Sequence, residues 1–277
     1  MNKILQYSSL VLLTVLYTPG SAAQDFLDYM LQGMVWEIGA GVLGLSLPLY
    51  PGSTQNAGYV IPYPYLKLES KYLDVNRGIE GKLFRSSRVR FSVSGDLGVP
   101  VDSKDSTVRR GMPDLDLVLQ FGPSLDVVFN ADKPKKREFR LELPLRLAIA
   151  TDGYSSRNTG WLFEPRLAYE ATRRNRAGWS YEFLAGFRFA TEKFHNYYYE
   201  VAPQYATPER PQYTAAGGYG GAFTELIASW RRKDLIYYTW LRYQYIGNAV
   251  YADSPLVEID DSFLIGIGLN WIIAESL

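Results

Sequence analysis

The single histidine of the chain, His195, is the side chain that most resembles a catalytic group. It follows Phe194 in a segment that we expect to be a long loop, where it could act as a general base for a serine nucleophile. The Gly-x-Ser-x-Gly pattern of a nucleophile elbow does not occur in the sequence, and no second histidine is present to share a metal ion. We therefore expect His195 to be an ordinary polar loop residue, and we predict no catalytic residue and no enzymatic activity.

Two pairs of neighbouring carboxylates are the next candidates for chemistry. Asp114 with Asp116, and Asp260 with Asp261, have side chains of the kind that bind calcium or act as an acid and a base. Such pairs more often lie solvated at strand ends, so we predict no metal site. The glycine-rich segment 217–221 lacks the lysine and the following helix of a phosphate-binding loop, and glycines within a strand mark a bend or a bulge. We therefore predict no cofactor.

Basic residues concentrate in two short segments, 133–137 and 173–176. Their charges could bind murein carboxylates or lipopolysaccharide phosphates, although solvated charge at a membrane rim is the simpler interpretation. The whole chain has 29 Lys+Arg and 29 Asp+Glu, so no net field attracts nucleic acid. The absence of cysteine excludes a disulfide framework, cysteine-ligated zinc, a thiol nucleophile and a lipid anchor on an N-terminal cysteine.

The N-terminus has the pattern of an export signal. Lys3 precedes an apolar run at 10–16, and Ser21-Ala22-Ala23 fits the small-x-small rule for cleavage. We expect residues 1–23 to be a signal peptide and residues 24–277 to form one outer-membrane β-barrel. After residue 23 the sequence has no apolar run of about 18 residues, the length that a transmembrane helix needs.

Alternation of apolar and polar residues is the main structural signal in the mature chain. It is clearest at 141–149, 181–189 and 263–273, where one face is apolar and the other carries Gly, Ala, Asn and isolated charges. A soluble sandwich also alternates, but its outward face is uniformly polar and its inward face large. Segments of about ten residues have the length of tilted strands that cross a membrane. The pattern favours an all-β, closed antiparallel transmembrane barrel.

The alternating segments number about ten, and an even number agrees with other bacterial barrels. The expected strands are 34–45, 63–84, 89–99, 115–129, 138–150, 162–171, 179–190, 214–230, 235–246 and 262–273. Short connections (85–88, 130–137, 172–178 and 231–234) alternate with long ones (46–62, 100–114, 151–161, 191–213 and 247–261), as periplasmic turns and outer loops would. A twelve-stranded alternative splits 63–84 at 74–78 and adds a strand at 197–201.

This topology makes two further predictions. The tryptophans at 36, 179, 230 and 271 fall near the periplasmic rim, where barrels carry an aromatic girdle. Charges of both signs face the lumen, and the long outer loops should cover its mouth. Positions two apart on one strand face lie about 6–7 Å apart, so Glu164 and Arg166 should pair directly. Other inward charges should find partners across neighbouring strands. They are Glu142, Arg146, Glu182 and Arg188.

Four short motifs occur in order along the mature chain. They are Gly-Ala-Gly-Val at 39–42 before Pro-Leu-Tyr-Pro-Gly at 48–52, Arg-Gly-Met-Pro-Asp-Leu-Asp at 110–116, Tyr-Tyr-Glu-Val at 198–201 before Arg-Pro-Gln-Tyr at 210–213, and Gly-Asn-Ala-Val-Tyr-Ala-Asp-Ser-Pro-Leu at 247–256. These motifs, in this order, resemble the MipA/OmpV family of outer-membrane proteins. The resemblance implies a barrel in the outer membrane of a Gram-negative cell, in contact with outer-membrane lipid.

For one branch of that family, the resemblance also implies a scaffold that ties a murein lytic transglycosylase to a bifunctional penicillin-binding synthase. We therefore expect a non-enzymatic structural protein of the cell envelope. A narrow outer-membrane pore, or a surface antigen or adhesin, remains the alternative.

Overall fold

The computed structural model describes residues 34–69, 73–75, 79–81, 84–85, 88–132, 134–173 and 177–276. The expected signal peptide at 1–23 lies outside these residues. Among them, no helix is long and apolar enough to cross a membrane.

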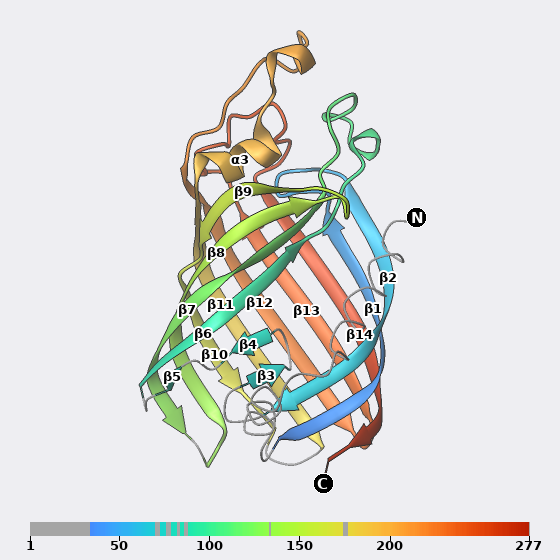
Figure 1. Ribbon diagram of the computed structural model, residues 1–277, viewed down its shortest axis with the longest axis vertical. Coiled ribbons are helices and arrows are strands. Elements are labelled where there is room, and N and C mark those ends of the chain that lie inside the picture. Colours follow the sequence, from blue (N-terminus) through green and yellow to red (C-terminus); the bar gives the residue numbers. More distant parts are fainter. Residues whose placement is uncertain are drawn as a thin grey trace, which may run out of the picture.

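Antiparallel strands form a single sheet that curves into a closed barrel (Figure 1). The strands are β1 (Val35–Pro48), β2 (Asn56–Glu69), β3 (Leu73–Val75), β4 (Ile79–Gly81), β5 (Phe84–Arg85), β6 (Val89–Gly98), β7 (Leu117–Asp132), β8 (Arg137–Thr151), β9 (Ser156–Phe163), β10 (Arg166–Ala171), β11 (Gly178–Ala190), β12 (Gly218–Arg232), β13 (Leu235–Tyr245) and β14 (Asp261–Glu275). The last long strand, β14, pairs with β1, and β4 packs beside β6.

The outward faces of the strands form an apolar belt. On β14, Phe263, Ile265 and Ile267 point outward and are 61%, 49% and 64% exposed, whereas Asn270 on the other face is 0% exposed. A soluble protein would bury such a face, but a barrel in lipid exposes it to hydrocarbon. The chain is therefore a transmembrane barrel, as the alternation predicted.

The prediction for the second strand, 63–84, was wrong. The chain enters β2 at Asn56, pairs with β1 from Pro48↔Asn56 to Val35↔Glu69, and then continues into the three short strands β3, β4 and β5. Residues 56–62, with Pro62 among them, fell in the expected connection 46–62, yet proline is compatible with a strand whose outer edge is unpaired.

The predicted count of about ten agrees with the number of long passes but not with the number of separate strands, and twelve agrees with neither. The sheet has fourteen strands in the described part of the chain, of which β3, β4 and β5 are short, and β9 and β10 follow each other in one pass of the wall. The described wall thus contains ten long passes. The strict alternation of connection lengths was also wrong, because β9 begins at Ser156 and leaves only residues 152–155 between β8 and β9.

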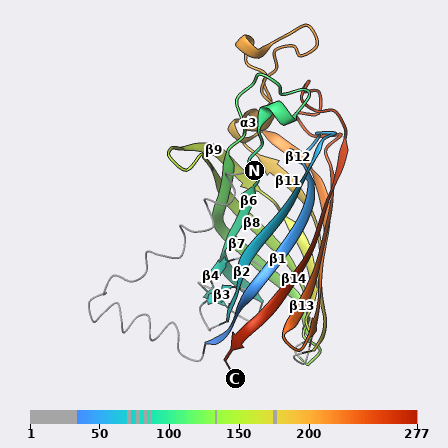
Figure 2. The same cartoon turned by 90° about the vertical axis from the view of Figure 1, so that its right-hand side faces the viewer.

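One end of the barrel, which we call the cap end, carries the helical elements. These are α3 (Glu192–Tyr199), η1 (Ser103–Asp105) and η2 (Pro203–Tyr205). Residues 191–213 were expected as a loop, and 197–201 as a strand in the twelve-stranded alternative. The structure instead forms the helix α3 over most of this stretch, so both expectations were wrong there. α3 lies across the cap end in both views (Figure 2).

The opposite end, which we call the turn end, carries the aromatic rim. Trp179 stacks on Trp230 with ring centroids 6.3 Å apart, and Trp230 stacks on Tyr237 at 5.5 Å. Trp271 pairs in register with the first residue of β13, and the backbone of Trp36 bonds to Ser276 near the C-terminus. The four tryptophans therefore share one rim, as predicted, and the side of the membrane that this rim faces stays a prediction.

Candidate functional site: the capped barrel lumen

Near the cap end, buried ion pairs meet at Glu164, which lies between β9 and β10 and is 1% exposed. Its carboxylate is 2.7 Å from Arg146 Nη1 and 2.7 Å from Arg188 Nη2, and 3.8 Å from Arg242 Nη2. Arg242 pairs in turn with Glu225 at 3.3 Å. These side chains come from β8, β11, β12 and β13, and only β9 and β10 lie between β8 and β11 in the wall. The ion pairs therefore join neighbouring strands on the lumen side.

A second group of charges surrounds Arg140 on β8, closer to the turn end. Arg140 donates to Glu142 at 2.7 Å, to Glu182 at 2.5 Å and to Glu170 at 3.1 Å. Glu142 also accepts a bond of 2.5 Å from Arg166 Nε. A buried guanidinium is costly unless charged acceptors occupy its donors, and here three carboxylates do so.

A third group closes the turn end. Arg231 donates to Glu37 at 2.7 Å and to Glu275 at 2.9 Å. Glu37 also lies 3.6 Å from Lys67 Nζ and accepts a bond of 3.2 Å from Tyr65. These contacts join β1, β2, β12 and β14, so they tie the two ends of the chain together inside the barrel.

The predicted direct pair of Glu164 with Arg166 is replaced by contacts between strands. Arg166 donates to Glu142, and Glu164 accepts from Arg188 Nε at 2.7 Å. The spacing argument failed because β9 ends at Phe163 and β10 begins at Arg166, so the two residues do not follow each other on one strand face. The remaining inward charges find partners on other strands, as expected.

A cap of connections covers the lumen. Tyr199 of α3 stacks on Tyr251 with ring centroids 3.8 Å apart. Tyr199 donates to the carbonyl of Pro51, and Tyr251 donates to that of Gly220, at 2.9 and 2.8 Å. Burial raises the pKa of Tyr50, at the edge of this stack, to about 12, so its hydroxyl remains a donor. The apolar centre of the cap is formed by Tyr50, Val101, Leu115, Tyr199, Val201, Ala215, Ile246, Ala249, Tyr251 and Leu256.

His195 belongs to this cap and is not an ordinary loop residue. It is 1% exposed within α3, its ring lies 4.7 Å from that of Tyr251, and its Nδ1 is 2.8 Å from the carbonyl oxygen of Ala216. A carbonyl only accepts, so Nδ1 donates and the neutral ring presents a lone pair at Nε2. Burial lowers the pKa of His195, against the opposing effect of the bond to Ala216, with a smaller lowering from Arg188.

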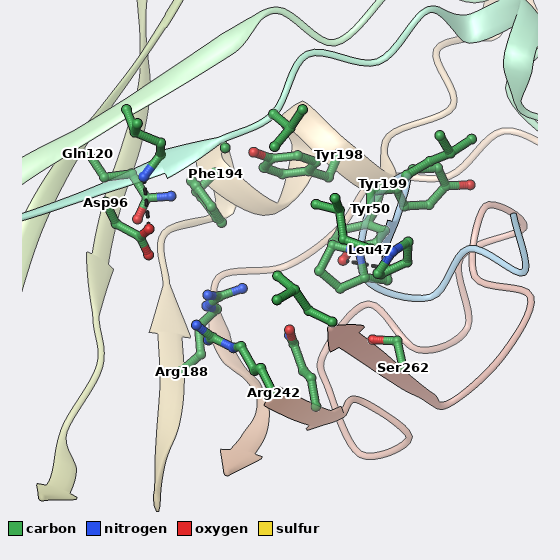
Figure 3. A pocket seen from close by; sticks show the side chains of 18 of the residues that line it. Leu47, Tyr50, Asp96, Gln120, Arg188, Phe194, Tyr198, Tyr199, Arg242 and Ser262 are labelled. Carbon is green, nitrogen blue, oxygen red and sulfur yellow. Dashed lines mark hydrogen bonds between the residues drawn. The ribbon is translucent and has the colours of Figure 1, made fainter. Parts of the chain in front are cut away.

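A cavity of about 160 Å³ lies between the cap and the charges of the lumen. Arg188 and Arg242 project into it beneath Phe194 and Tyr198 of α3 (Figure 3). Besides tyrosines, the lining includes the polar side chains of Asp96, Gln120, Arg188, His195, Trp240, Arg242, Gln244 and Ser262. Sequence reasoning missed Trp240 and Arg242 as site residues, although their positions two apart on β13 place both on the inward face.

The other sequence candidates have structural roles. Asp114 accepts a bond from the backbone of Ser103, and Asp116 pairs with Arg157 at 3.1 Å. The pairs 114/116 and 260/261 lie at strand ends, as expected, and the described residues contain no cluster of three or more His, Cys, Asp or Glu side chains that could hold a metal ion. Residues 133 and 174–176 of the two basic segments lie outside the described residues.

The glycine-rich segment 217–221 forms the bulge that its composition predicted. The register of β11 against β12 shifts between Arg188↔Gly221 and Phe189↔Tyr219, which leaves Gly220 without a partner in this ladder. Gly221 has a φ of 117°, which L side chains rarely adopt. A side chain at Gly220 would come within 3.1 Å of His195 Nε2, so the bulge makes room for the histidine.

Comparisons with known proteins give one family and several distant barrels. The family model described as MltA-interacting protein MipA matches residues 38–273. A Pseudomonas aeruginosa FadL homologue has a TM-score of 0.34 and 8% identity, over 87% of this chain and 68% of that one. The outer membrane protein OprG of the same organism has a TM-score of 0.23 and 11% identity, over 86% and 92% of the two chains. The Escherichia coli outer membrane protease OmpT has a TM-score of 0.29 and 8% identity, over 87% and 96%. These scores support no inference about function, and the comparison with curated proteins gives no match.

Proposed function

The chain belongs to the family described as MltA-interacting protein MipA, and we propose that it is a non-enzymatic scaffold that holds murein-processing enzymes at the outer membrane. As a transmembrane β-barrel of this family, it is an outer-membrane protein. The proposed partners are a lytic transglycosylase of the MltA type, to which the family description refers, and a bifunctional penicillin-binding synthase.

The observation that carries this proposal is the filled interior of the barrel. The ion pairs of Glu164, Arg140 and Arg231 join nearby strands on the lumen side at three levels, and the cap covers one end. Barrels with few strands fill their interior with side chains, whereas wide barrels leave an aqueous channel. A filled and capped barrel is suited to hold a rigid surface in the membrane, and poorly suited to general diffusion.

The turn end offers the surface that a periplasmic partner would contact. The stacked rings of Trp179, Trp230 and Tyr237 lie at this rim, and the same end of the barrel carries exposed basic side chains such as Lys135 and Arg232. Aromatic residues with surrounding positive charge are common in protein interfaces. The cap end, which carries the family-like segments 198–201 and 247–256, would face away from the periplasm in this orientation.

A catalytic role has less support. His195 Nδ1 is used by the carbonyl of Ala216, and its ring packs on Tyr251. Neither contact supplies a nucleophile that the histidine would activate. The scaffold proposal therefore assigns no chemical step to the barrel itself.

A binding measurement tests the proposal. The barrel is reconstituted in lipid nanodiscs, immobilised, and exposed to a purified lytic transglycosylase of the MltA type or to a purified bifunctional synthase. We expect saturable binding, weakened about tenfold by the double substitution Lys135→Glu/Arg232→Glu at the turn end.

The matched control is Arg157→Glu, which reverses an exposed charge at the cap end. It should leave binding unchanged. Failure of both enzymes to bind the wild-type barrel refutes the scaffold, and equal loss with the control variant refutes the proposed surface.

A further inference from the structure

The cap end carries a second pocket, which shares no lining residue with the cavity beneath the cap. Its volume is about 290 Å³, and its walls come from residues 109–115 before β7, from β9, from α3 and from residues 200–205. The sequence motifs at 110–116 and 198–201 therefore meet at this pocket. The scaffold role gives neither motif a task.

Contacts between these segments fix the shape of the pocket. Arg109 Nη1 donates to the carbonyl of Tyr198 at 2.8 Å, and the backbone amide of Asp116 donates to the Tyr197 hydroxyl at 2.7 Å. The guanidinium of Arg157 on β9 lies 5.1 Å from the centroid of the Tyr197 ring. The pocket is thus formed in the protein alone, as is usual for small-molecule sites.

The pocket offers hydrogen-bond donors and acceptors together. Asn158 and Asn196 line it, and their side-chain oxygens accept the backbone amides of Gly160 and Ala215 at 2.8 and 2.7 Å. Because each oxygen is engaged, each side chain keeps its NH₂ group as a donor, and no bond from either group is found in the described part of the chain. Glu200, exposed at the end of α3, adds a carboxylate acceptor that has no ion pair among the described residues.

Two buried residues of the lining have polar atoms without a partner in the described part of the chain. Arg109 and Thr159 are each 3% exposed, and the atoms are Arg109 Nε and Thr159 Oγ1. Leaving a buried donor or acceptor unpaired costs free energy. A ligand hydroxyl both donates and accepts, so it can satisfy either atom, whereas a carboxylate only accepts.

Charge at the pocket is balanced. The cations of the lining are Arg109, Arg157 and Lys193. The carboxylates that offset them are Asp114 and Glu200 in the lining and Asp116, which pairs with Arg157 at 3.1 Å. Equal numbers of both signs create no strong net field, so the pocket favours a neutral polar ligand over an ion of either sign.

Size and apolar surface narrow the ligand further. A cavity of about 150 Å³ holds benzene, with six heavy atoms, so a pocket of about 290 Å³ holds roughly twelve, as many as a hexose has. The ring of Tyr205 lines the pocket and has no aromatic or cationic partner among the described residues, whereas Arg157 covers that of Tyr197. An aromatic ring of this kind packs against the apolar C–H face of a sugar.

We propose that this pocket binds a neutral hexose unit of a glycan. The sugar places its C–H face on Tyr205, donates a hydroxyl to Glu200 and accepts bonds from the amide groups of Asn158 and Asn196. This goes beyond the scaffold role, because the barrel itself holds a ligand at the end that faces away from the periplasm in the proposed orientation. The hexose belongs either to a soluble sugar outside the cell or to the sugar chain of a neighbouring lipopolysaccharide, and the chemistry is the same.

The test is saturation-transfer NMR on the barrel in phospholipid nanodiscs. The probes are the neutral methyl glycosides of glucose, galactose, mannose and N-acetylglucosamine. We expect transfer to at least one of them, with a Kd of about 1 mM and the strongest signal at the C–H protons of one ring face. The absence of transfer to all four overturns the proposal. So does binding of methyl glucuronide or methyl glucosaminide, which are charged, more than about tenfold tighter than the best neutral probe.

Variants tie the signal to the pocket. Tyr205→Ala and Glu200→Gln should each weaken binding of the best probe about tenfold, because they remove the stacking ring and the charged acceptor. The matched controls are Tyr154→Ala and Glu209→Gln, which change exposed residues outside the pocket and should leave binding unchanged. Unchanged binding in both pocket variants, or an equal loss in their controls, overturns the assignment of the site.

A second set of nanodiscs distinguishes the two sources of the sugar. If lipopolysaccharide supplies it, nanodiscs that contain lipopolysaccharide should reduce transfer to the added glycoside at least about tenfold, because the pocket is already filled. Undiminished transfer assigns the pocket to a soluble sugar, and either result supports a hexose site. The enzyme-binding test of the scaffold concerns the turn end, so its failure would leave glycoside binding unchanged.

Discussion

Replacing Glu164 by Gln removes one negative charge from the most crowded ion pairs of the lumen. The Glu164 carboxylate is 1% exposed and lies within 4 Å of Arg146, Arg188 and Arg242. Gln keeps the volume and one acceptor oxygen, so packing changes little. Three guanidinium groups then share the two carboxylates that remain near them, Asp96 and Glu225.

The expected loss in the free energy of unfolding follows from this geometry. Breaking a buried pair by removing one partner costs about 3–5 kcal/mol. Because Asp96 lies 3.4 Å from Arg146 and Glu225 lies 3.3 Å from Arg242, part of the positive charge stays compensated. We therefore expect the lower end of that range, about 3 kcal/mol. Arg188 has Glu164 as its closest partner, so Glu164→Gln combined with Arg188→Gln should recover part of the loss.

This change is measured by unfolding the barrel with urea in lipid vesicles. The fraction folded is read from unboiled gels, on which folded and unfolded barrel have different mobilities. The control is Asp116→Asn, which breaks the exposed pair with Arg157 at 3.1 Å and should cost about 0–1 kcal/mol. If Glu164→Gln costs no more than this control, the lumen is hydrated and screened. The argument for a filled interior would then fail, and the pore alternative would gain support.

Three further predictions concern the lumen, the orientation and the cap. In planar bilayers the purified barrel should show no steady conductance of the size of a sixteen-stranded porin, and such a conductance would contradict the filled interior. A cysteine placed at Tyr154, which is 99% exposed at the cap end, should react with a membrane-impermeant thiol reagent on intact cells. A cysteine at Lys135 should react only after the outer membrane is opened. Ser254 lies in a predicted outer loop but is 3% exposed, so a cysteine there would be a poor reporter. Because burial lowers the pKa of His195 below the value of about 6.5 that it has in an unfolded chain, the unfolded cap binds more protons, so cap stability should fall as the pH drops below about 6.5. Hydrogen exchange at the backbone amides of residues 191–217 should therefore become faster at acid pH. Arg188 and the tyrosine hydroxyls around His195 keep their charge state over this range. If the His195→Gln variant shows the same pH dependence, another group is responsible.

The local alternation of apolar and polar residues was sufficient to predict the strands whose two faces differ in polarity. The alternation at 141–149 predicted β8 and its inward face, since a period of two specifies which side chains meet lipid. The same reasoning placed the four tryptophans at one rim. It failed at β2, which begins at Asn56 within the expected connection 46–62 and ends at Glu69, well before residue 84.

The sequence by itself determined the class of the protein, the faces of most strands and the sign of the charges in the lumen, because these depend on residue type and on spacing along one strand. Tertiary structure decided which charges meet. Glu164 reaches Arg188 because β9 and β10, which follow each other in one pass, both pair with β11, and no spacing rule along the chain brings positions 164 and 188 together. The same holds for the fold of α3 over the lumen, which buries His195. Contacts between residues distant in sequence depend on register and closure, and these are properties of the whole barrel.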